Sequence, residues 1–397
     1  MENLFDKNIN IFEIGISTLA SKLNINGKNF FEVSGYSMYA LYVLIYSINV
    51  TTIINCSWSP VVLNFLEIAF VLMLVFKFIV TQYNIKHFLC VGAILGLLSI
   101  SYLNSGYADF IQYTIVIFAL KDLNINKVVR NTFFIKSFMF ITTICLSLTN
   151  VIENQFMDGE RNRYYLGYFH PNMAMTFFLS ILLDWCIIRK EKFKWTDAII
   201  MIILSTILYK LTDSRTSFMC ILMLIISMIL YKTKVFKSIL ELVAVPLLLV
   251  LCVFSVTIPF WYNQNYSFFT NIDKILSWRL AFIKEVYEYI GGYNLFGNNV
   301  DDIPRSMDNG YFYIIIIYGI VVFLLIALLY LLIVALSKTT DFDYLIPLLL
   351  IVFIYSVFEH LLTDIRCNSI LLFASVFLQK DAIKNAVLNI KEKNKSY

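Results

Sequence analysis

Long apolar segments follow one another along almost the whole of this 397-residue chain. Hydrophobic residues make up 59% of the chain and charged residues only 15%. A soluble domain of this size cannot bury so large an apolar fraction, so the composition indicates a protein that crosses a membrane several times. Because a helix needs roughly 20 apolar residues to span the hydrocarbon core, the chain divides into about twelve predicted spans.

The predicted fold is an all-α polytopic bundle with mostly short connections. The spans are expected near residues 34–54, 60–80, 87–103, 106–120, 132–152, 170–188, 195–210, 215–231, 236–258, 309–336, 344–359 and 364–379. The third and fourth spans are short, and a re-entrant pair is the alternative for them. One long connection, residues 259–308, stands apart, and long loops in compact proteins are usually functional.

Polar segments flank the predicted transmembrane domain, which we place at residues 34–380. Residues 1–33 carry apolar side chains at helical spacing from Ile9 to Leu23, which predicts an amphipathic helix on the inner membrane surface. A loosely ordered tail is the alternative for this segment. Residues 381–397 are rich in lysine and are expected at the inner leaflet, so both termini are predicted to be cytoplasmic.

The basic residues fit this topology, but arginine is distributed unlike lysine. The predicted inner side receives 22 of the 31 basic residues, as the positive-inside bias requires. The outer side nevertheless receives six arginines, which are Arg161, Arg163, Arg215, Arg279, Arg305 and Arg366. A guanidinium group stays protonated and matches two phosphate oxygens, so this bias predicts a phosphate-bearing substrate on the outer face.

The first candidate segment runs from Arg161 to Asn172. His170 followed by Pro171 is typical of a helix start, whose N–H groups and positive dipole end favour an anion. Arg161 and Arg163 lie just upstream. The alternatives are that His170 and Asn172 only cap the helix, and that the two arginines contact lipid head groups.

The second candidate segment is the predicted outer turn at residues 212–217. Arg215 lies at the mouth of a span, where a buried guanidinium costs several kcal/mol unless it is paired. Asp213 is close enough in sequence to be its partner. A purely structural Asp213–Arg215 pair is the alternative.

The long connection and the end of the chain supply the remaining candidates. Residues 278–290 have helical periodicity and are followed by Gly291, so we predict a helix there that lies across the outer mouth of the bundle. The other polar candidates are Arg279, Arg305, Asp308, Asn309, Glu359 and His360. For His360, a structural histidine with satisfied hydrogen bonds is the alternative.

Several kinds of site are not indicated. The seven cysteines are scattered without ligand spacing, so neither a metal site nor a disulfide is predicted. The chain has no nucleotide-binding glycine motif, nucleophile elbow or basic nucleic-acid patch. Glu67 lies in the middle of a predicted span and ranks below the outer cluster, while Asp184 is expected to be solvated near an inner helix end.

Taken in order, these segments resemble the O-antigen and capsular polysaccharide polymerase (Wzy-type) and O-antigen ligase superfamily over about residues 105–375. The resemblance rests on Ala119-Leu-Lys-Asp-Leu123, Arg163 with Gly167-Tyr-Phe-His-Pro-Asn172, Asp213-Ser-Arg-Thr216, Trp278-Arg279 with Asn294-Leu-Phe-Gly297, Asp308-Asn-Gly-Tyr311 with Tyr318-Gly-Ile320, and Glu359 to Asn368. The order of the motifs, rather than any single one, carries the resemblance.

The resemblance implies a GT-C-like helical bundle in the bacterial plasma membrane. It implies an inverting glycosyltransferase that acts at the outer face on undecaprenyl-pyrophosphate-linked oligosaccharides, without nucleotide sugar, metal or other cofactor. A chain-length regulator and a flippase are the candidate partner proteins. Ligases typically carry a histidine in the segment that contains Asp308, so this departure favours a polymerase. The Arg-x10-Gly spacing of some polymerases is also not met.

A lipid pyrophosphate is already a good leaving group, so the enzyme has to hold its charge and align the acceptor hydroxyl. We expect Arg163 and Arg215 to hold the pyrophosphate, and Asp308 or His170 to act as the base. The predicted substrate-binding residues are Arg161, Arg279, Arg305, Asn172, Asn309, Glu359 and His360.

Three alternative functions are open at this point. An O-antigen ligase-type transferase would attach the glycan to another acceptor. A lipid-linked oligosaccharide flippase or solute transporter would need polar residues through the depth of the bundle, and the sparse charge within the spans argues against it. A non-catalytic scaffold gives no reason for the arginine bias.

Overall fold

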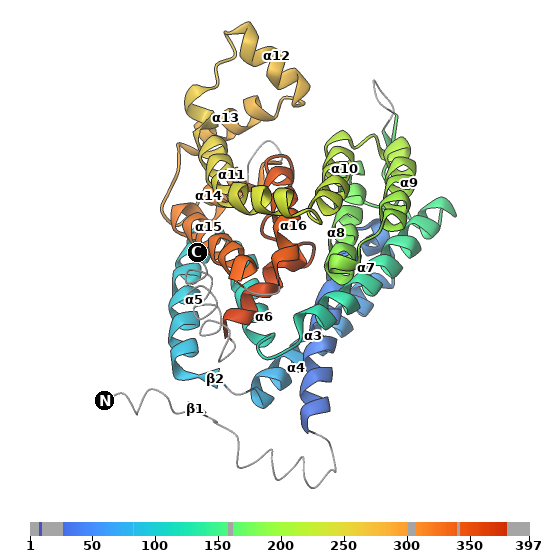
Figure 1. The fold of residues 1–397 in the computed structure, drawn as a ribbon, viewed down its shortest axis with the longest axis vertical. Coiled ribbons are helices and arrows are strands. Elements are labelled where there is room, and N and C mark those ends of the chain that lie inside the picture. The colour runs from blue at the N-terminus through green and yellow to red at the C-terminus, as the bar shows by residue number, and fades with distance from the viewer. Residues whose placement is uncertain are drawn as a thin grey trace. The chain divides into compact units, whose positions relative to one another are not determined.

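A computed structural model describes residues 8–9, 27–81, 83–157, 162–300, 307–339 and 342–378. The described part is mostly helical, which is consistent with the predicted all-α membrane protein (Figure 1). The predicted tail at residues 381–397 lies outside the described residues, as do Arg161 and Arg305. Most of the predicted amphipathic segment also lies outside them, although Asn8–Ile9 forms a short strand, β1.

Within these ranges, seven helices are long and apolar enough to cross a membrane by length and composition. They are Ser59–Val80, Ile85–Ser105, Ile125–Leu148, Pro171–Lys192, Trp195–Thr212, Lys234–Trp261 and Gly319–Lys338. Four further apolar helices are shorter, which are Asp109–Ala119, Arg215–Leu230, Asp343–Tyr355 and Ser369–Leu378. Membrane-spanning character is therefore supported, whereas the predicted count of twelve spans is not confirmed.

The chain forms two compact units. Unit 1 comprises the described residues up to Ala93, Thr114–Leu222, and those from Ile365 onward; unit 2 comprises Ile94–Tyr113 and Met223–Asp364. The elements of unit 1 are β1, α3 (Gly27–Asn49), η1 (Thr52–Asn55), α4 (Ser59–Val80), β2 (Tyr83–Asn84), α7 (Ile125–Leu148), β3 (Phe156–Met157), β4 (Arg163–Tyr164), α8 (Pro171–Arg189), η2 (Lys190–Lys192), α9 (Trp195–Thr212) and η4 (Ser369–Leu378). The unit boundaries divide α5 (Ile85–Ser105), α6 (Asp109–Ala119) and α10 (Arg215–Leu230).

Unit 1 is a helical bundle in which α3 packs against α4 and α7, and α8 packs against α7 and α9. The strands form two small antiparallel pairs, β1 with β2 and β3 with β4. Most of α8 is buried, whereas α4 is apolar and largely exposed or half-buried. An exposed apolar helix suits contact with lipid. Glu67 lies on α4 and is exposed.

Unit 2 is built around one long helix. Its elements are α11 (Lys234–Trp261), α12 (Ser267–Ile275), α13 (Arg279–Ile290), α14 (Gly310–Ile317), α15 (Gly319–Thr339), η3 (Asp343–Leu345) and α16 (Ile346–Tyr355). Helix α11 packs against α13, α14, α15 and α16, while α12 and α13 follow its C-terminal end (Figure 1). The predicted helix at residues 278–290 is confirmed as α13, which ends at Gly291 with φ of 83°.

The predicted span at residues 309–336 is not one continuous helix. Helix α14 ends at Ile317, and α15 starts at Gly319, whose φ is +91°. The loop Asn294–Asn298 supplies the backbone hydrogen bonds that the break removes: Asn298 N donates to Ile317 O at 3.2 Å, and Ile320 N donates to Asn294 O at 3.0 Å. We call this contact the loop–break junction. A hydropathy pattern cannot reveal such a break, because both halves are equally apolar.

Candidate functional site

The polar residues predicted to form the site fall into one group in unit 1 and another in unit 2. The unit 1 group begins at the β3–β4 hairpin, where Met157 pairs with Arg163. The chain then turns through Gly167, whose φ is +80° and whose carbonyl oxygen accepts a 2.8 Å bond from Thr52 N. The positive φ favours glycine at this position, and a Cβ on Gly167 would lie 2.8 Å from Ile152 Cδ1, so that side chain would have to shift.

The predicted helix start at His170-Pro171 is confirmed. His170 is the N-cap of α8, with extended backbone angles, and its Nδ1 accepts a 3.1 Å hydrogen bond from Asn172 N. Pro171 occupies the first turn, where its missing N–H removes no helical bond. His170 therefore caps the helix, which was the alternative to a role in anion binding.

Arg163 joins three segments of unit 1. Its side chain is buried, its Nε donates to the carbonyl oxygen of Thr212 at 2.8 Å, and its Nη2 donates to Asn172 Oδ1. Thr212 is the last residue of α9, and a helix C-terminus carries carbonyl groups without helical partners. Arg163 thus ties the strand β4 to the start of α8 and to the end of α9.

The turn between α9 and α10 contains the predicted Asp213–Arg215 pair. Asp213 adopts left-handed backbone angles with φ of 44°, and its Oδ1 lies 3.6 Å from Arg215 Nε. The pair is therefore confirmed, but the Arg215 side chain is 68% exposed and not buried. Arg215 is also the first residue of α10, where the positive end of the helix dipole adds to its charge.

These contacts bring Arg163, His170, Asn172 and Arg215 into one region of unit 1. The α8 and α10 N-termini both lie near the end of α9, because Arg163 bonds both Asn172 at the start of α8 and Thr212 at the end of α9, and α10 begins at Arg215. Two positive helix ends and two guanidinium groups therefore share one end of this unit. Such an arrangement can attract and orient a doubly charged anion.

The unit 2 group is centred on Arg279, at the start of α13. Its Nε lies 3.2 Å from Asp308 Oδ2, and its Nη2 lies 3.0 Å from Glu359 Oε1. The side chains of Arg279 and Glu359 are 14% and 13% exposed, whereas that of Asp308 is 35% exposed. Arg279 thus holds two carboxylates, one of which, Asp308, reaches solvent.

Asn309 and Gly310 fix the position of Asp308. Asn309 is the N-cap of α14: its Oδ1 accepts from Phe312 N at 2.9 Å, and its Nδ2 donates to Ser255 Oγ at 3.1 Å. Gly310 N donates to Ser356 O at 2.8 Å. A small recess in this region is lined by Arg279, Phe282, Ile283, Met307, Asp308 and Asn309.

Asp273 supports the start of α13 and was not identified from the sequence. It is fully buried, and its carboxylate accepts hydrogen bonds from Leu280 N, Ala281 N and Tyr262 Oη, at 2.8, 3.0 and 2.7 Å. Burial and the neighbouring carboxylate raise the pKa of Tyr262, so its hydroxyl stays protonated and donates. Asp273 thereby fixes the first turn of α13, which begins at Arg279.

His360 makes none of these hydrogen bonds, but it lies within electrostatic reach of Asp308. Its ring meets that of Tyr313 edge-on at 4.2 Å, and the residue is exposed. The interaction is an aromatic packing contact, so a role of His360 in substrate binding stays a prediction. Within the described ranges, no group of three or more His, Cys, Asp or Glu residues is placed to hold a metal ion.

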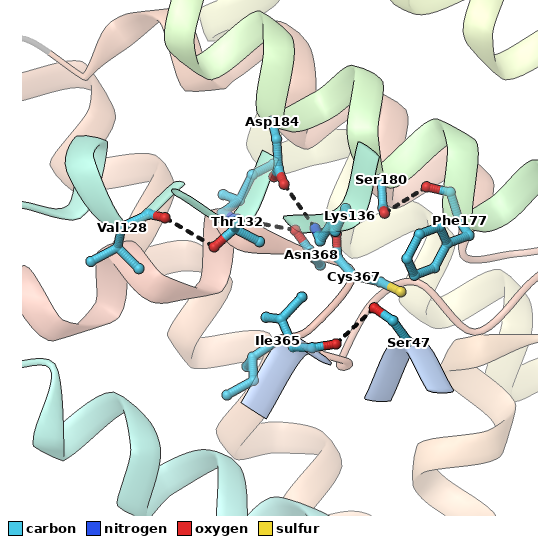
Figure 2. Close-up of polar contacts among 12 residues, drawn as sticks. Ser47, Val128, Thr132, Lys136, Phe177, Ser180, Asp184, Ile365, Cys367 and Asn368 are labelled. Atoms are coloured by element: carbon cyan, nitrogen blue, oxygen red, sulfur yellow. Dashed lines mark hydrogen bonds and ion pairs between the residues drawn. The ribbon is translucent and has the colours of Figure 1, made fainter. Parts of the chain in front are cut away.

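The expectation for Asp184 is wrong. Asp184 is fully buried rather than solvated, and its Oδ2 lies 2.9 Å from Nζ of Lys136, which is also fully buried (Figure 2). The two residues lie on α8 and α7, and 48 positions separate them in the sequence. Local sequence gave no sign of the pair, because hydropathy around Asp184 resembles that of any helix end.

Comparisons with known proteins add no assignment to this geometry. No family model, no curated protein and no solved structure matches the chain.

Proposed function

We propose that this chain is a polysaccharide polymerase, a membrane glycosyltransferase that joins undecaprenyl-pyrophosphate-linked oligosaccharide repeat units at the outer face of the bacterial plasma membrane. The observation that carries the proposal is the group formed by Arg163, Asn172 and Arg215 at one end of unit 1. Two arginines and two helix N-termini suit a departing diphosphate better than a neutral ligand.

The reaction needs no covalent enzyme intermediate. The acceptor hydroxyl oxygen attacks the anomeric carbon of the lipid-linked glycan, the bond from that carbon to the phosphate oxygen breaks, and the diphosphate leaves with the electron pair. Arg215 and Arg163 stabilise the charge that develops on the leaving group. Removal of one such contact should cost roughly 2–4 kcal/mol in the transition state, by analogy with oxyanion donors.

The proton of the acceptor hydroxyl has to go to a base. We assign this role to Asp308, because its carboxylate is partly exposed and is oriented by Arg279. Glu359 is the less exposed carboxylate of the same arginine and serves to hold it. His170 is the second candidate, but its Nδ1 already accepts the N–H of Asn172. General base catalysis of this kind typically contributes about 10²–10⁴-fold.

The proposal is tested in cells that lack the gene, complemented with Arg163→Ala, Arg215→Ala or Arg130→Ala. Arg130 is an exposed arginine on α7 and serves as the matched control. We expect Arg163→Ala and Arg215→Ala to abolish long polysaccharide, as seen on gels. Because Arg163 is buried and also ties β4 to α8 and α9, the exposed Arg215 carries the test, and Arg215→Ala and Arg130→Ala should both insert at wild-type levels. Wild-type chain lengths in Arg163→Ala and Arg215→Ala would reject the proposal. A change of attachment without a change of length would favour a ligase.

A lipid-linked oligosaccharide flippase is the second candidate, since the α14–α15 helix is discontinuous and broken helices are common in transporters. In this chain the loop Asn294–Asn298 hydrogen-bonds to the backbone groups at the break. Those groups are therefore less suited to bind a substrate. Repeat units that still reach the outer leaflet in cells without the gene would exclude the flippase.

A further inference from the structure

The apolar interior of unit 1 contains two opposite charges that the proposed reaction does not use. Lys136 of α7 and Asp184 of α8 are both fully buried and form an ion pair of 2.9 Å (Figure 2). Ionisable residues inside a membrane protein are expensive and usually serve a function. Replacement of such a pair by apolar residues is often neutral for stability, so stability alone does not explain it.

The pair holds a turn of the chain in place. Nζ of Lys136 donates to the carbonyl oxygen of Cys367 at 3.2 Å, and Figure 2 shows Lys136 between Asp184 and the segment Cys367–Asn368. Helix α3 holds the same turn from another side, because Tyr39 Oη donates to Ile365 O at 2.6 Å. The residues on both sides of position 366 are therefore fixed by buried polar contacts.

Arg366 lies in this turn, between the two residues whose carbonyl groups are held. Its guanidinium lies over the ring of Tyr46 at 4.3 Å and near that of Tyr42 at 5.7 Å, and the residue is half-buried. Aromatic rings at these distances restrict the orientation of a guanidinium, whose planar fork of N–H groups suits phosphate oxygens.

The position of Arg366 relates it to the start of α8. The ring of Tyr46 stacks on Phe177 with a centroid distance of 6.4 Å. Phe177 is five residues after Asn172 along α8, a rise of about 8 Å. Arg366 thus lies in unit 1 beside the helix whose N-terminus Arg163 contacts.

We propose that Arg366 is a further residue that binds the diphosphate of the lipid-linked substrate, and that Lys136 and Asp184 are positioning residues that fix its turn. This inference rests on the proposed function. The chemistry recognised is a phosphate ester, which an anionic phospholipid head group also carries. The experiment therefore has to compare these two sources.

The test uses the full-length protein in nanodiscs, titrated with undecaprenyl pyrophosphate or with phosphatidylglycerol and monitored by native mass spectrometry. We expect Arg366→Ala to weaken undecaprenyl pyrophosphate binding at least tenfold, Arg366→Lys to weaken it less, and Arg130→Ala to leave it unchanged. Phosphatidylglycerol binding should be the same in all variants. Unchanged undecaprenyl pyrophosphate binding, or an equal loss for both lipids, would overturn the inference.

A second set of variants separates positioning from folding. Lys136→Met leaves Asp184 unpaired and should lower the amount of folded protein, whereas Lys136→Met with Asp184→Leu leaves no unpaired charge and should restore it. The double variant still lacks the bond to Cys367 O. We expect it to bind undecaprenyl pyrophosphate as weakly as Arg366→Ala does. Wild-type binding by the folded double variant would show that the pair is merely structural.

The outcomes also separate this inference from the proposed function. If Arg163→Ala weakens undecaprenyl pyrophosphate binding and Arg366→Ala does not, the proposed function stands and the inference about Arg366 is wrong. If the wild-type protein does not bind this lipid at all, both are wrong.

Discussion

A Cβ atom on Gly297 would lie 1.9 Å from the carbonyl oxygen of Ile317. This distance is far below any contact that real side chains make, and the obstacle is backbone, which cannot rotate away. Gly297 also has φ of +91°, in the left-handed region that favours glycine. The loop–break junction of unit 2 therefore depends on the absence of a side chain at this position.

Gly297→Ala should destabilise unit 2 strongly, because it adds a backbone clash to the strain of the left-handed conformation. Gly291→Ala is the matched control: Gly291 has φ of +83°, but nothing lies within 4 Å of its virtual Cβ. The control should lose only about 1–2 kcal/mol. Thermal unfolding of the purified proteins in detergent measures the difference. Equal melting temperatures would show that the loop–break junction does not depend on glycine at position 297.

Asp273→Ala should destabilise α13, because it leaves two backbone N–H groups and the Tyr262 hydroxyl in a buried site without their acceptor. Each buried unsatisfied group costs about 1–3 kcal/mol. Tyr262→Phe removes only one of the three bonds and should cost about 0.5–1.5 kcal/mol. Chemical denaturation of both variants checks this order, and an equal loss would show that Asp273 is not the main support.

Asp308→Asn and Glu359→Gln should affect different properties. Asp308→Asn removes the proposed base at a partly exposed site, so polymerisation should fall by about 10²–10⁴-fold with little change in melting temperature. Glu359→Gln weakens a mostly buried partner of Arg279 and should lower stability by about 1–3 kcal/mol while activity falls less. The opposite pattern in polymer gels and melting curves would move the base to Glu359.

His170→Asn separates the two roles of His170. Asparagine is also a favourable N-cap, so α8 should keep its stability, whereas the imidazole is lost. Since we assign the base to Asp308, polymer length should be retained within a few-fold. A loss comparable to that of Asp308→Asn would identify His170 as the base instead. His170→Ala, which removes cap and imidazole together, should cost roughly 0.5–2 kcal/mol of stability.

Features encoded by neighbouring residues could be predicted from the sequence. The start of α8 at Pro171 and the end of α13 at Gly291 follow from local capping chemistry, and both agree with the structure. The Asp213–Arg215 pair is also local, because a single turn brings the two side chains together. Apolar runs likewise located the helices, although not their number across a membrane.

Contacts between distant segments could not be predicted in the same way. Arg279 and Glu359 are 80 positions apart, and Lys136 and Asp184 lie on different helices, so their pairing depends on how helices pack. Arg279 was expected to contact substrate, yet two carboxylates already surround it. The break at Gly319 escaped detection because hydropathy averages over residues and does not record hydrogen bonds.

The loop that meets the end of α14 does so with main-chain atoms. The carbonyl groups of Asn294 and Leu295 accept hydrogen bonds from the N–H groups of Ile320 and Val321. Almost any residue type can make such main-chain bonds. Only glycine at positions 297 and 319 is demanded by geometry. A chain can therefore change widely in this loop and still keep the interrupted helix, provided that those two glycines are retained.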